Sequence, residues 1–338
     1  MNKDLRLAAL TALSSMVLAS CGGGSSEQVA PAPPPSSADY VVHEVLPSTI
    51  DPAANDQISD VHVIIPPIAG VTPVGKLFVF LPGTDGVPTD YQLILKAGAG
   101  RGFHTIGLDY ANSSAVGVTC LTSTDVNCFW DVRREVITGG NYSPDVAIAP
   151  ADSIVTRLTK AIAYLNTTYP SEGWGQYLAN GAVDWSKIVV GGHSQGGGHA
   201  GVMTKLYAMS RACYFASPPD WDTNTNSPAA WESYTSVTPV SAQYGFGGLQ
   251  DPSVPYSQLS VIWETMGLMN STSSAVSVDS NTPPYGDSHA LTTNAQPDTS
   301  TTDPGTPLHG LTVRDAFTPL TSSGTPVFDP VWGYLCFQ

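Results

Sequence analysis

The chain has 338 residues, of which 42% are hydrophobic and only 12% are charged. This balance supplies material for a large buried core and excludes a collagen-like chain, a coiled coil and a chain kept disordered by its own charge. Thirteen lysines and arginines stand against 28 aspartates and glutamates, a formal net charge of −15. A surface of that sign repels phosphates, so no nucleic-acid partner is expected.

The first 20 residues are typical of a secretory signal peptide. Lys3 and Arg6 form a basic opening, and the apolar stretch 7–18 is too short to cross about 30 Å of hydrocarbon as a stable helix. The stretch ends in Leu-Ala-Ser-Cys at positions 18–21, which resembles the lipobox of bacterial lipoproteins. The resemblance implies cleavage before Cys21 and a diacylglycerol on its thiol. An ordinary signal peptide with a chance cysteine is the alternative.

Residues 22–38 mix Gly, Ser and Pro, a composition typical of a linker that holds a folded domain away from a membrane. We therefore expect a linker at 21–39 and a single folded domain at 40–338. The residue after the cysteine is Gly22 and not Asp. In this the chain resembles lipoproteins that are sorted to the outer membrane. The expected location is the cell envelope or, without the anchor, the extracellular space, and the expected state is a monomer.

Four cysteines follow Cys21, namely Cys120, Cys128, Cys213 and Cys336. An even number in an exported chain predicts two disulfides, because the envelope is an oxidising compartment. Connectivity does not follow from the sequence, but pairing Cys120 with Cys128 and Cys213 with Cys336 is the least strained arrangement by sequence distance. No C-x-x-C or H-x-x-x-H pair occurs, so we expect neither a metal ion nor a cofactor.

Strands and helices alternate along the rest of the chain. The continuous apolar run 77–81 is typical of a strand buried on both faces of a parallel sheet. Further strands are expected at 61–65, 104–108, 187–190, 213–216, 240–244 and 275–278, and helices at 91–99, 154–169, 201–209 and 257–269. This alternation predicts an α/β fold with a mostly parallel sheet covered by helices on both faces. Residues 111–150 and 280–308 are expected to form long, lid-like loops.

Residues 192–196, Gly-His-Ser-Gln-Gly, match the pattern G-x-S-x-G directly after the strand expected at 187–190. A serine on such a strand-to-helix turn is held in a strained conformation that only small neighbours permit. Glycines at 191, 192 and 196–198 provide that space. The N–H of Gln195, at the start of the following helix, would point at negative charge developing on a substrate carbonyl oxygen. Ser194 is therefore a candidate nucleophile, and a purely structural Gly-rich turn is the alternative.

With this motif, nearly all of residues 60–338 resembles the α/β-hydrolase family, most closely its secreted bacterial serine esterases and lipases. The resemblance implies that carboxylic esters are cleaved through an acyl-enzyme intermediate. It also implies a nucleophile, an acid and a histidine in that order along the chain, with a second oxyanion donor in a loop after an earlier strand. In the loop 81–86, Leu-Pro-Gly-Thr-Asp-Gly, the implied donor is the N–H of Thr84, with Gly83 as its competitor.

Two histidines out of seven lie after the last expected strand, where the fold would place the base. We favour His309, which precedes a glycine and a final segment expected to pack on the sheet. His289 lies nearer that strand and is the alternative; the histidine that is not the base would be a lid or surface residue. His193 and His199 sit beside the motif and are expected in the core or behind the catalytic residues.

For the acid, Asp251 is the preferred residue. It lies in the segment 248–255, Gly-Leu-Gln-Asp-Pro-Ser-Val-Pro, which follows a strand and resembles the aspartate loop of these hydrolases. Its carboxylate would hold the second ring nitrogen of the histidine and stabilise the imidazolium cation. Asp220, in the segment 217–221 after the preceding strand, is the rival.

Other readings of the same residues remain open. The fold fixes the catalytic residues but not the substrate, so a peptidase, an acyltransferase or a thioesterase would use the same set. A non-catalytic lipoprotein that binds a ligand on this scaffold is the alternative from another class. Four tryptophans are candidates for an apolar acyl pocket, although tryptophan more often packs in a core or rim: Trp130, Trp221, Trp231 and Trp263.

Overall fold

The computed structural model describes residues 40–338 except positions 58, 271, 273 and 300–305. The predicted signal peptide, the linker and Cys21 therefore lie outside the described residues. Within the described ranges, no helix combines the length and the apolar composition that a membrane crossing requires.

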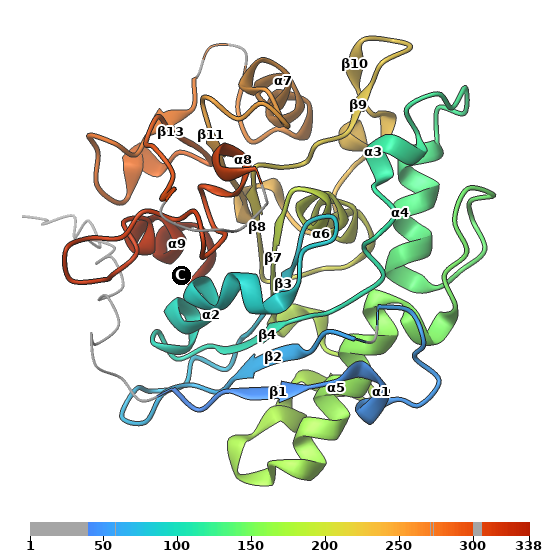
Figure 1. Ribbon diagram of the computed structural model, residues 1–338, viewed down its shortest axis with the longest axis vertical. Helices are drawn as coiled ribbons and strands as arrows, with labels where there is room; N and C mark the ends of the chain where they lie inside the picture. The colour runs from blue at the N-terminus through green and yellow to red at the C-terminus, as the bar shows by residue number, and fades with distance from the viewer. Residues whose placement is uncertain (1–39, 58, 271, 273, 300–305) are drawn as a thin grey trace, which may run out of the picture.

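Nine strands of the described chain form one sheet, in the order β1-β2-β4-β3-β7-β8-β11-β13-β12 (Figure 1). Strand β2 is antiparallel to its neighbours β1 and β4, and every other neighbouring pair is parallel. The predicted α/β class and mostly parallel sheet are confirmed. The strands are β1 (His43–Val45), β2 (His62–Ile65), β3 (Leu77–Leu81), β4 (His104–Gly107), β7 (Ile188–His193), β8 (Arg211–Phe215), β11 (Gln243–Gly248), β12 (Val276–Ser277) and β13 (Ala290–Thr293). Two small hairpins are β5 (Leu178–Ala179) with β6 (Ala182–Val183) and β9 (Trp221–Asp222) with β10 (Ser227–Pro228).

Strand β3 shows why its sequence is continuously apolar. Alternate residues point to opposite faces of a strand, and here each face meets its own core. Leu77, Val79 and Leu81 pack into one hydrophobic cluster, whereas Phe78 and Phe80 pack into the other. All five side chains are fully buried.

Helices cover both faces of the sheet (Figure 1). One cluster packs under α4 (Cys128–Thr138), α5 (Ile154–Thr168), α6 (Gln195–Leu206) and α7 (Tyr256–Met266). The other packs under α2 (Gln92–Ala99) and α9 (Asp329–Cys336). Three single-turn helices complete the set: α1 (Pro47–Ile50), α3 (Val116–Thr119) and α8 (Pro307–Gly310).

Both segments predicted to be long loops contain regular structure. Helices α3 and α4 lie within 111–150, and the apolar face of α4 packs on the core. Strand β13 lies within 280–308 between β11 and β12. Its four residues, Ala-Leu-Thr-Thr, are buried but too few and too mixed to show a strand pattern in the sequence, so the prediction of an unbroken loop there was wrong.

Two disulfides are present, as predicted. Cys120–Cys128 joins the end of α3 to the start of α4, and Cys213–Cys336 ties β8 to α9. The two cysteines of each pair have Cα atoms 5.7 Å apart, within the usual range for a disulfide. The second bond spans 123 positions of the chain, so it constrains the unfolded state far more than the first.

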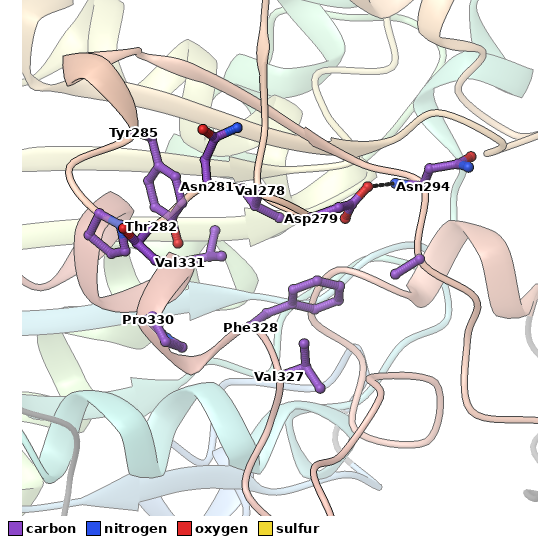
Figure 2. A pocket seen from close by; sticks show the side chains of 12 residues that line it. Val278, Asp279, Asn281, Thr282, Tyr285, Asn294, Val327, Phe328, Pro330 and Val331 are labelled. Atoms are coloured by element: carbon purple, nitrogen blue, oxygen red, sulfur yellow. Dashed lines mark hydrogen bonds between the residues drawn. The ribbon is translucent and has the colours of Figure 1, made fainter.

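A cavity of about 560 Å³ opens beside the edge strand β12, its neighbour β13 and the start of α9 (Figure 2). Tyr285 and Phe328 contribute aromatic rings to its lining. The carboxylate of Asp279 accepts hydrogen bonds from Thr293 Oγ1 at 2.5 Å and from the N–H of Asn294 at 2.8 Å. The carboxylate of Asp279 is thus engaged within the protein, and much of the remaining lining is apolar.

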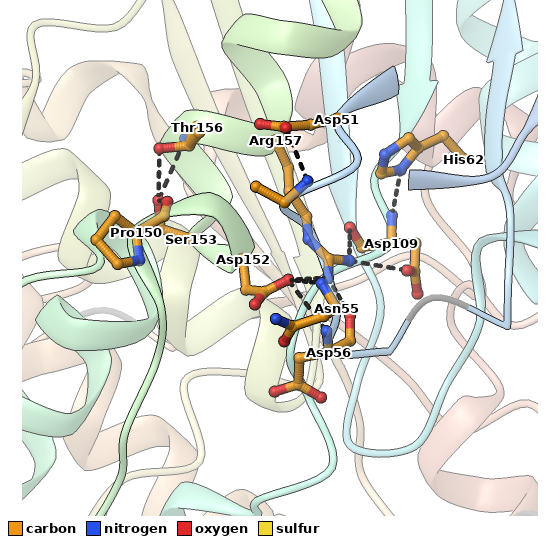
Figure 3. Close-up of polar contacts among 11 residues, drawn as sticks. Asp51, Asn55, Asp56, His62, Asp109, Pro150, Asp152, Ser153, Thr156 and Arg157 are labelled. Carbon is orange, nitrogen blue, oxygen red and sulfur yellow. Dashed lines mark hydrogen bonds and ion pairs between the residues drawn. The ribbon is translucent and has the colours of Figure 1, made fainter. Parts of the chain in front are cut away.

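A buried arginine fastens the N-terminal segment to the sheet (Figure 3). Arg157 of α5 donates from Nη1 to Asp109 Oδ2 and from Nη2 to Asp152 Oδ1, both at 2.9 Å, and Nη2 also binds the carbonyl oxygen of Asp56. Burial raises the pKa of Asp109 to about 7 despite this ion pair. Asp109 begins the segment after β4, and its N–H donates to His62 Nδ1 at 2.9 Å, so this cluster anchors the chain that leads to the site described next.

Candidate active site

Ser194 occupies a sharp turn between the end of β7 and the start of α6. Its φ of 51° and ψ of −119° lie in a region that side-chain-bearing residues rarely adopt. A Cβ at position 192 would overlap the backbone of Gly196, and a Cβ at position 196 would overlap the carbonyl oxygens of Leu81 and Pro82. Both flanking glycines of the motif are therefore required by the close approach of the backbone.

The side chains of His309 and Asp251 are joined by a hydrogen bond. Nδ1 of His309, on α8, lies 2.7 Å from Oδ2 of Asp251, which follows β11. The Asp251 side chain is only 1% exposed, and its other oxygen accepts the N–H groups of Ser253 and Val254 at 2.8 and 3.2 Å. These bonds fix the carboxylate and leave Nε2 of the imidazole for another partner.

Ser194 and His309 line the same cavity, which has a volume of about 270 Å³. The Ser194 hydroxyl has no hydrogen-bond partner among the described residues, so its contact with Nε2 of His309 stays an expectation. Catalytic hydrogen bonds are often long before substrate binds. The structure nevertheless brings the predicted nucleophile, base and acid to one edge of the sheet, where the carboxyl ends of the parallel strands meet.

The two rival residues are placed elsewhere. His289 precedes β13 and stacks on Tyr244, with ring centroids 4.4 Å apart. Its Nδ1 lies 2.8 Å from the carbonyl oxygen of Gln243, at the amino end of β11, whereas Asp251 follows the carboxyl end of that strand. Asp220 does lie after a strand at the correct edge, but it is fully buried and both of its oxygens bind Arg133.

Arg133 and Asp220 form a buried ion pair that contacts the turn at Ser194. The Arg133 guanidinium binds the Asp220 carboxylate through Nε at 2.6 Å and Nη2 at 2.5 Å, and Trp231 Nε1 donates to the same carboxylate at 2.8 Å. Nη1 of Arg133 donates to the carbonyl oxygen of Gln195 at 2.9 Å. A Cβ at Gly198 would overlap the guanidinium. This ion pair could not be predicted from the sequence, because its two residues lie 87 positions apart.

Two main-chain N–H groups, at Gln195 next to Ser194 and at Thr84 in the cavity lining, are candidate oxyanion donors. The first helical hydrogen bond of α6 runs from Gly198 N–H to Ser194 O, so the N–H of Gln195 has no helical acceptor. In the other loop, Gly83 N–H is directed at Tyr91 Oη, 3.4 Å away. The N–H of Thr84 has no acceptor among the described residues, and Thr84 lines the cavity. This geometry favours Thr84 over its competitor Gly83.

Two side-chain amides hold these donors in place. Gln195 Oε1 accepts Thr84 Oγ1 at 3.1 Å and the N–H of Val116 at 2.9 Å, while Nε2 donates to the carbonyl oxygen of Asn112 at 3.0 Å. Asn112 Nδ2 donates to the carbonyl oxygens of Gly83 and Gly86 at 2.9 and 2.8 Å. Only the backbone N–H of Gln195 was predicted to act at the site, and Asn112 was not predicted, because nothing but the length of its segment distinguishes it in the sequence.

Two further histidines flank the turn and are uncharged. Burial lowers the pKa of both His193 and His199 well below the usual value, with the neighbouring His309 and Arg133, respectively, acting in the same direction. His199 is fully buried against the ring of Tyr110. His193 lines the cavity together with Ser194 and Tyr91.

The residues that line the cavity at Ser194 do not include any of the four tryptophans proposed for an acyl pocket. Trp231 and Trp263 are fully buried in the core instead. Among the described residues, no group of three or more His, Cys, Asp or Glu side chains is placed to hold a metal ion.

Comparison with known proteins adds no relative: no family model matches the chain, and no curated protein matches it. The description of the chain therefore depends on its fold and on the geometry of its candidate site. It is an α/β protein with a mostly parallel nine-stranded sheet. A serine on a strained turn, a histidine paired with a buried aspartate and two candidate main-chain donors gather at the carboxyl ends of its strands.

Proposed function

We propose that the protein is an exported serine hydrolase of the α/β-hydrolase family that cleaves carboxylic esters through an acyl-enzyme intermediate. The observation that carries the proposal is His309, whose Nδ1 is bonded to Asp251 at 2.7 Å while its ring lines the cavity that holds Ser194. General-base activation of a hydroxyl requires a histidine with one nitrogen fixed by a carboxylate and the other available to the serine, and a shared cavity is compatible with that arrangement.

In the proposed reaction, Ser194 Oγ attacks the ester carbonyl carbon and His309 Nε2 takes the hydroxyl proton. The charge that develops on the carbonyl oxygen is stabilised by the N–H groups of Gln195 and Thr84. Asp251 stabilises the imidazolium cation. His309 then protonates the leaving alkoxide, and water, activated by the same ring, releases the acid from Ser194.

The small volume of the cavity favours short-chain esters over long-chain lipids. At about 270 Å³ it is slightly smaller than the usual range for ligand pockets, about 300–1,000 Å³. Its lining contains no aliphatic side chain apart from the glycines' backbone, and the side chains present are mostly polar: Thr84, Tyr91, His193, Ser194, Ser253, Thr306, His309 and Arg314. A cavity of this volume cannot enclose a long acyl chain.

Export is supported by the two disulfides, which persist in oxidising compartments. Together with the lipobox-like residues 18–21, they support a protein tethered to the cell envelope through a lipid on Cys21.

The test is a chain-length series of p-nitrophenyl esters, from acetate through butyrate to octanoate, against wild type and Ser194→Ala. We expect kcat/KM to be highest for the shortest esters and to vanish in Ser194→Ala, and a fluorophosphonate probe to label Ser194 in the folded wild type. A wild type that neither turns over an ester nor takes the label would contradict the proposal and favour a ligand-binding lipoprotein. A preference for octanoate would contradict the substrate class alone.

A further inference from the structure

His193 is a buried side chain at the site that the proposed reaction does not use. Its ring centroid lies 4.6 Å from that of His309. Nε2 of His193 is 3.0 Å from the main-chain oxygen of His309, and Nδ1 is 3.0 Å from Tyr91 Oη. The Tyr91 oxygen in turn lies 3.4 Å from the N–H of Gly83. A continuous path of contacts thus joins the loop 81–86, which holds Gly83 and Thr84 and is called the oxyanion loop below, to the backbone of the proposed base.

The direction of each hydrogen bond along this path is determined by chemistry. A carbonyl oxygen only accepts, so Nε2 of His193 must carry the proton. Burial lowers the pKa of His193 well below its usual value, so the ring is neutral and Nδ1 is an acceptor. Tyr91 must then donate to Nδ1, and burial, which raises the pKa of its phenol, keeps that proton in place. Its oxygen remains free to accept from Gly83.

We propose that Tyr91 and His193 are positioning residues that fix the position of His309 relative to the oxyanion loop. The proposal rests on the proposed function. His309 lies on a helix of only four residues, so few helical hydrogen bonds hold its backbone, and the contact from His193 adds to them. A misplacement of about 1 Å at a reacting group costs up to about a hundredfold in rate.

The chain contains a matched control far from Ser194. Tyr177 Oη lies 2.8 Å from His104 Nδ1, and His104 Nε2 lies 2.7 Å from the carbonyl oxygen of Glu172. This second set has the same order of tyrosine, histidine and carbonyl, and both of its side chains are buried. It contacts the amino end of the sheet, where His104 opens β4, so its loss should affect stability without affecting the reaction.

The experiment compares kcat and KM for p-nitrophenyl acetate in Tyr91→Phe, His193→Leu, His193→Gln and the double variant Tyr91→Phe/His193→Leu, with thermal unfolding measured for each. We expect kcat to fall about tenfold in Tyr91→Phe and up to about a hundredfold in His193→Leu, with KM changed by less than about threefold. Glutamine can donate to the His309 carbonyl and accept from Tyr91, so His193→Gln should recover most of the rate lost in His193→Leu.

The double variant separates coupling from coincidence. If Tyr91 acts through His193, the double variant loses no more activity than His193→Leu alone. Three outcomes would overturn the inference while leaving an active esterase. The double variant could lose kcat by the product of the two single losses, or His193→Gln could fail to recover the rate. The loss of kcat in the Tyr91 and His193 variants could also be no greater than in the control variants Tyr177→Phe and His104→Leu. A wild type that neither turns over the ester nor reacts with a fluorophosphonate probe would overturn the proposed function and this inference with it.

A measurement without turnover checks the hydrogen-bond directions. In nitrogen-15 spectra of histidine-labelled protein, the resonance lost in His193→Gln should belong to a neutral ring protonated at Nε2, unchanged between about pH 5 and 8. A ring protonated at Nδ1, or one that titrates in this range, would overturn the assignment.

Discussion

Replacing Gln195 by leucine keeps the main-chain N–H proposed for the oxyanion hole and removes the side-chain amide that joins it to Thr84. The side chain is 3% exposed. Its loss leaves the N–H of Val116 and the carbonyl of Asn112 buried without partners, at about 1–3 kcal/mol each. We therefore expect the free energy of unfolding to fall by about 2–6 kcal/mol.

The fall in kcat expected for Gln195→Leu has an upper limit. Complete loss of one oxyanion donor costs about 2.7–4 kcal/mol, or about 10²–10³ in kcat. In Gln195→Leu, Asn112 still holds the carbonyls of Gly83 and Gly86, so the loop keeps part of its geometry. We expect kcat to fall by about tenfold to a hundredfold, with KM little changed.

Gln243→Leu is the matched control for the assay. Gln243 is fully buried, accepts Tyr214 Oη at 2.7 Å and donates to the carbonyl oxygen of Thr238 at 2.8 Å, at the amino end of β11. Urea unfolding should show similar destabilisation in both variants, whereas ester turnover by the folded fraction should fall only in Gln195→Leu. Equal loss of kcat in the two variants, or none in either, would refute the reasoning.

Three further outcomes are expected. His309→Ala should reduce kcat for p-nitrophenyl acetate by several orders of magnitude and His289→Ala only mildly; the reverse ranking in the same assay would transfer the role of the base. Asp251→Asn should lower kcat by up to about 10⁴-fold without unfolding the protein. Asp220→Asn leaves Arg133 as an uncompensated buried charge and should lower the free energy of unfolding in urea by about 3–5 kcal/mol. Equal stability of the two variants would contradict these different roles of the two aspartates. Removing the disulfide between β8 and α9 should lower stability by up to about 5 kcal/mol, against about 2.5 kcal/mol for the one between α3 and α4, and thermal unfolding of the two double-alanine variants would show whether that order holds.

The parts of this molecule that the sequence predicts are those encoded locally. The turn at Ser194 is marked by five contiguous residues that follow a buried apolar run, and its steric requirement for glycine can be anticipated without coordinates. Strand β3 and the first three residues of β7 are continuous apolar runs because both of their faces are buried. Asp251 and His309 lie 58 positions apart, and their order along the chain relative to the nucleophile restricted the choice without deciding it.

What the sequence does not predict depends on contacts between distant segments. Strand β13 becomes a strand because β11 and β12 pair with it on both sides, although its own four residues show no pattern. Asn112 reaches the oxyanion loop from the segment after β4, and nothing in its neighbours along the chain distinguishes it from a surface asparagine. The role of Asp220 changes from candidate acid to buried partner of Arg133 only when α4 is placed against α6.

The contacts around Ser194 also explain how a strained backbone is tolerated at that residue. A conformation of this kind costs about 1–3 kcal/mol and persists only where the surroundings determine it. The N–H of Ser194 donates to Phe215 O at 2.9 Å, and its carbonyl oxygen accepts Ser217 Oγ at 2.8 Å, so both of its main-chain groups are tied to the segment at the end of β8. Gln195 fixes the oxyanion loop from the next position along the chain, and His193 contacts the main chain of His309 from the preceding one. The proposed nucleophile, the proposed base and the candidate oxyanion donors are thus all in contact with residues of this turn. A substitution that shifts the turn should therefore disturb all of them together.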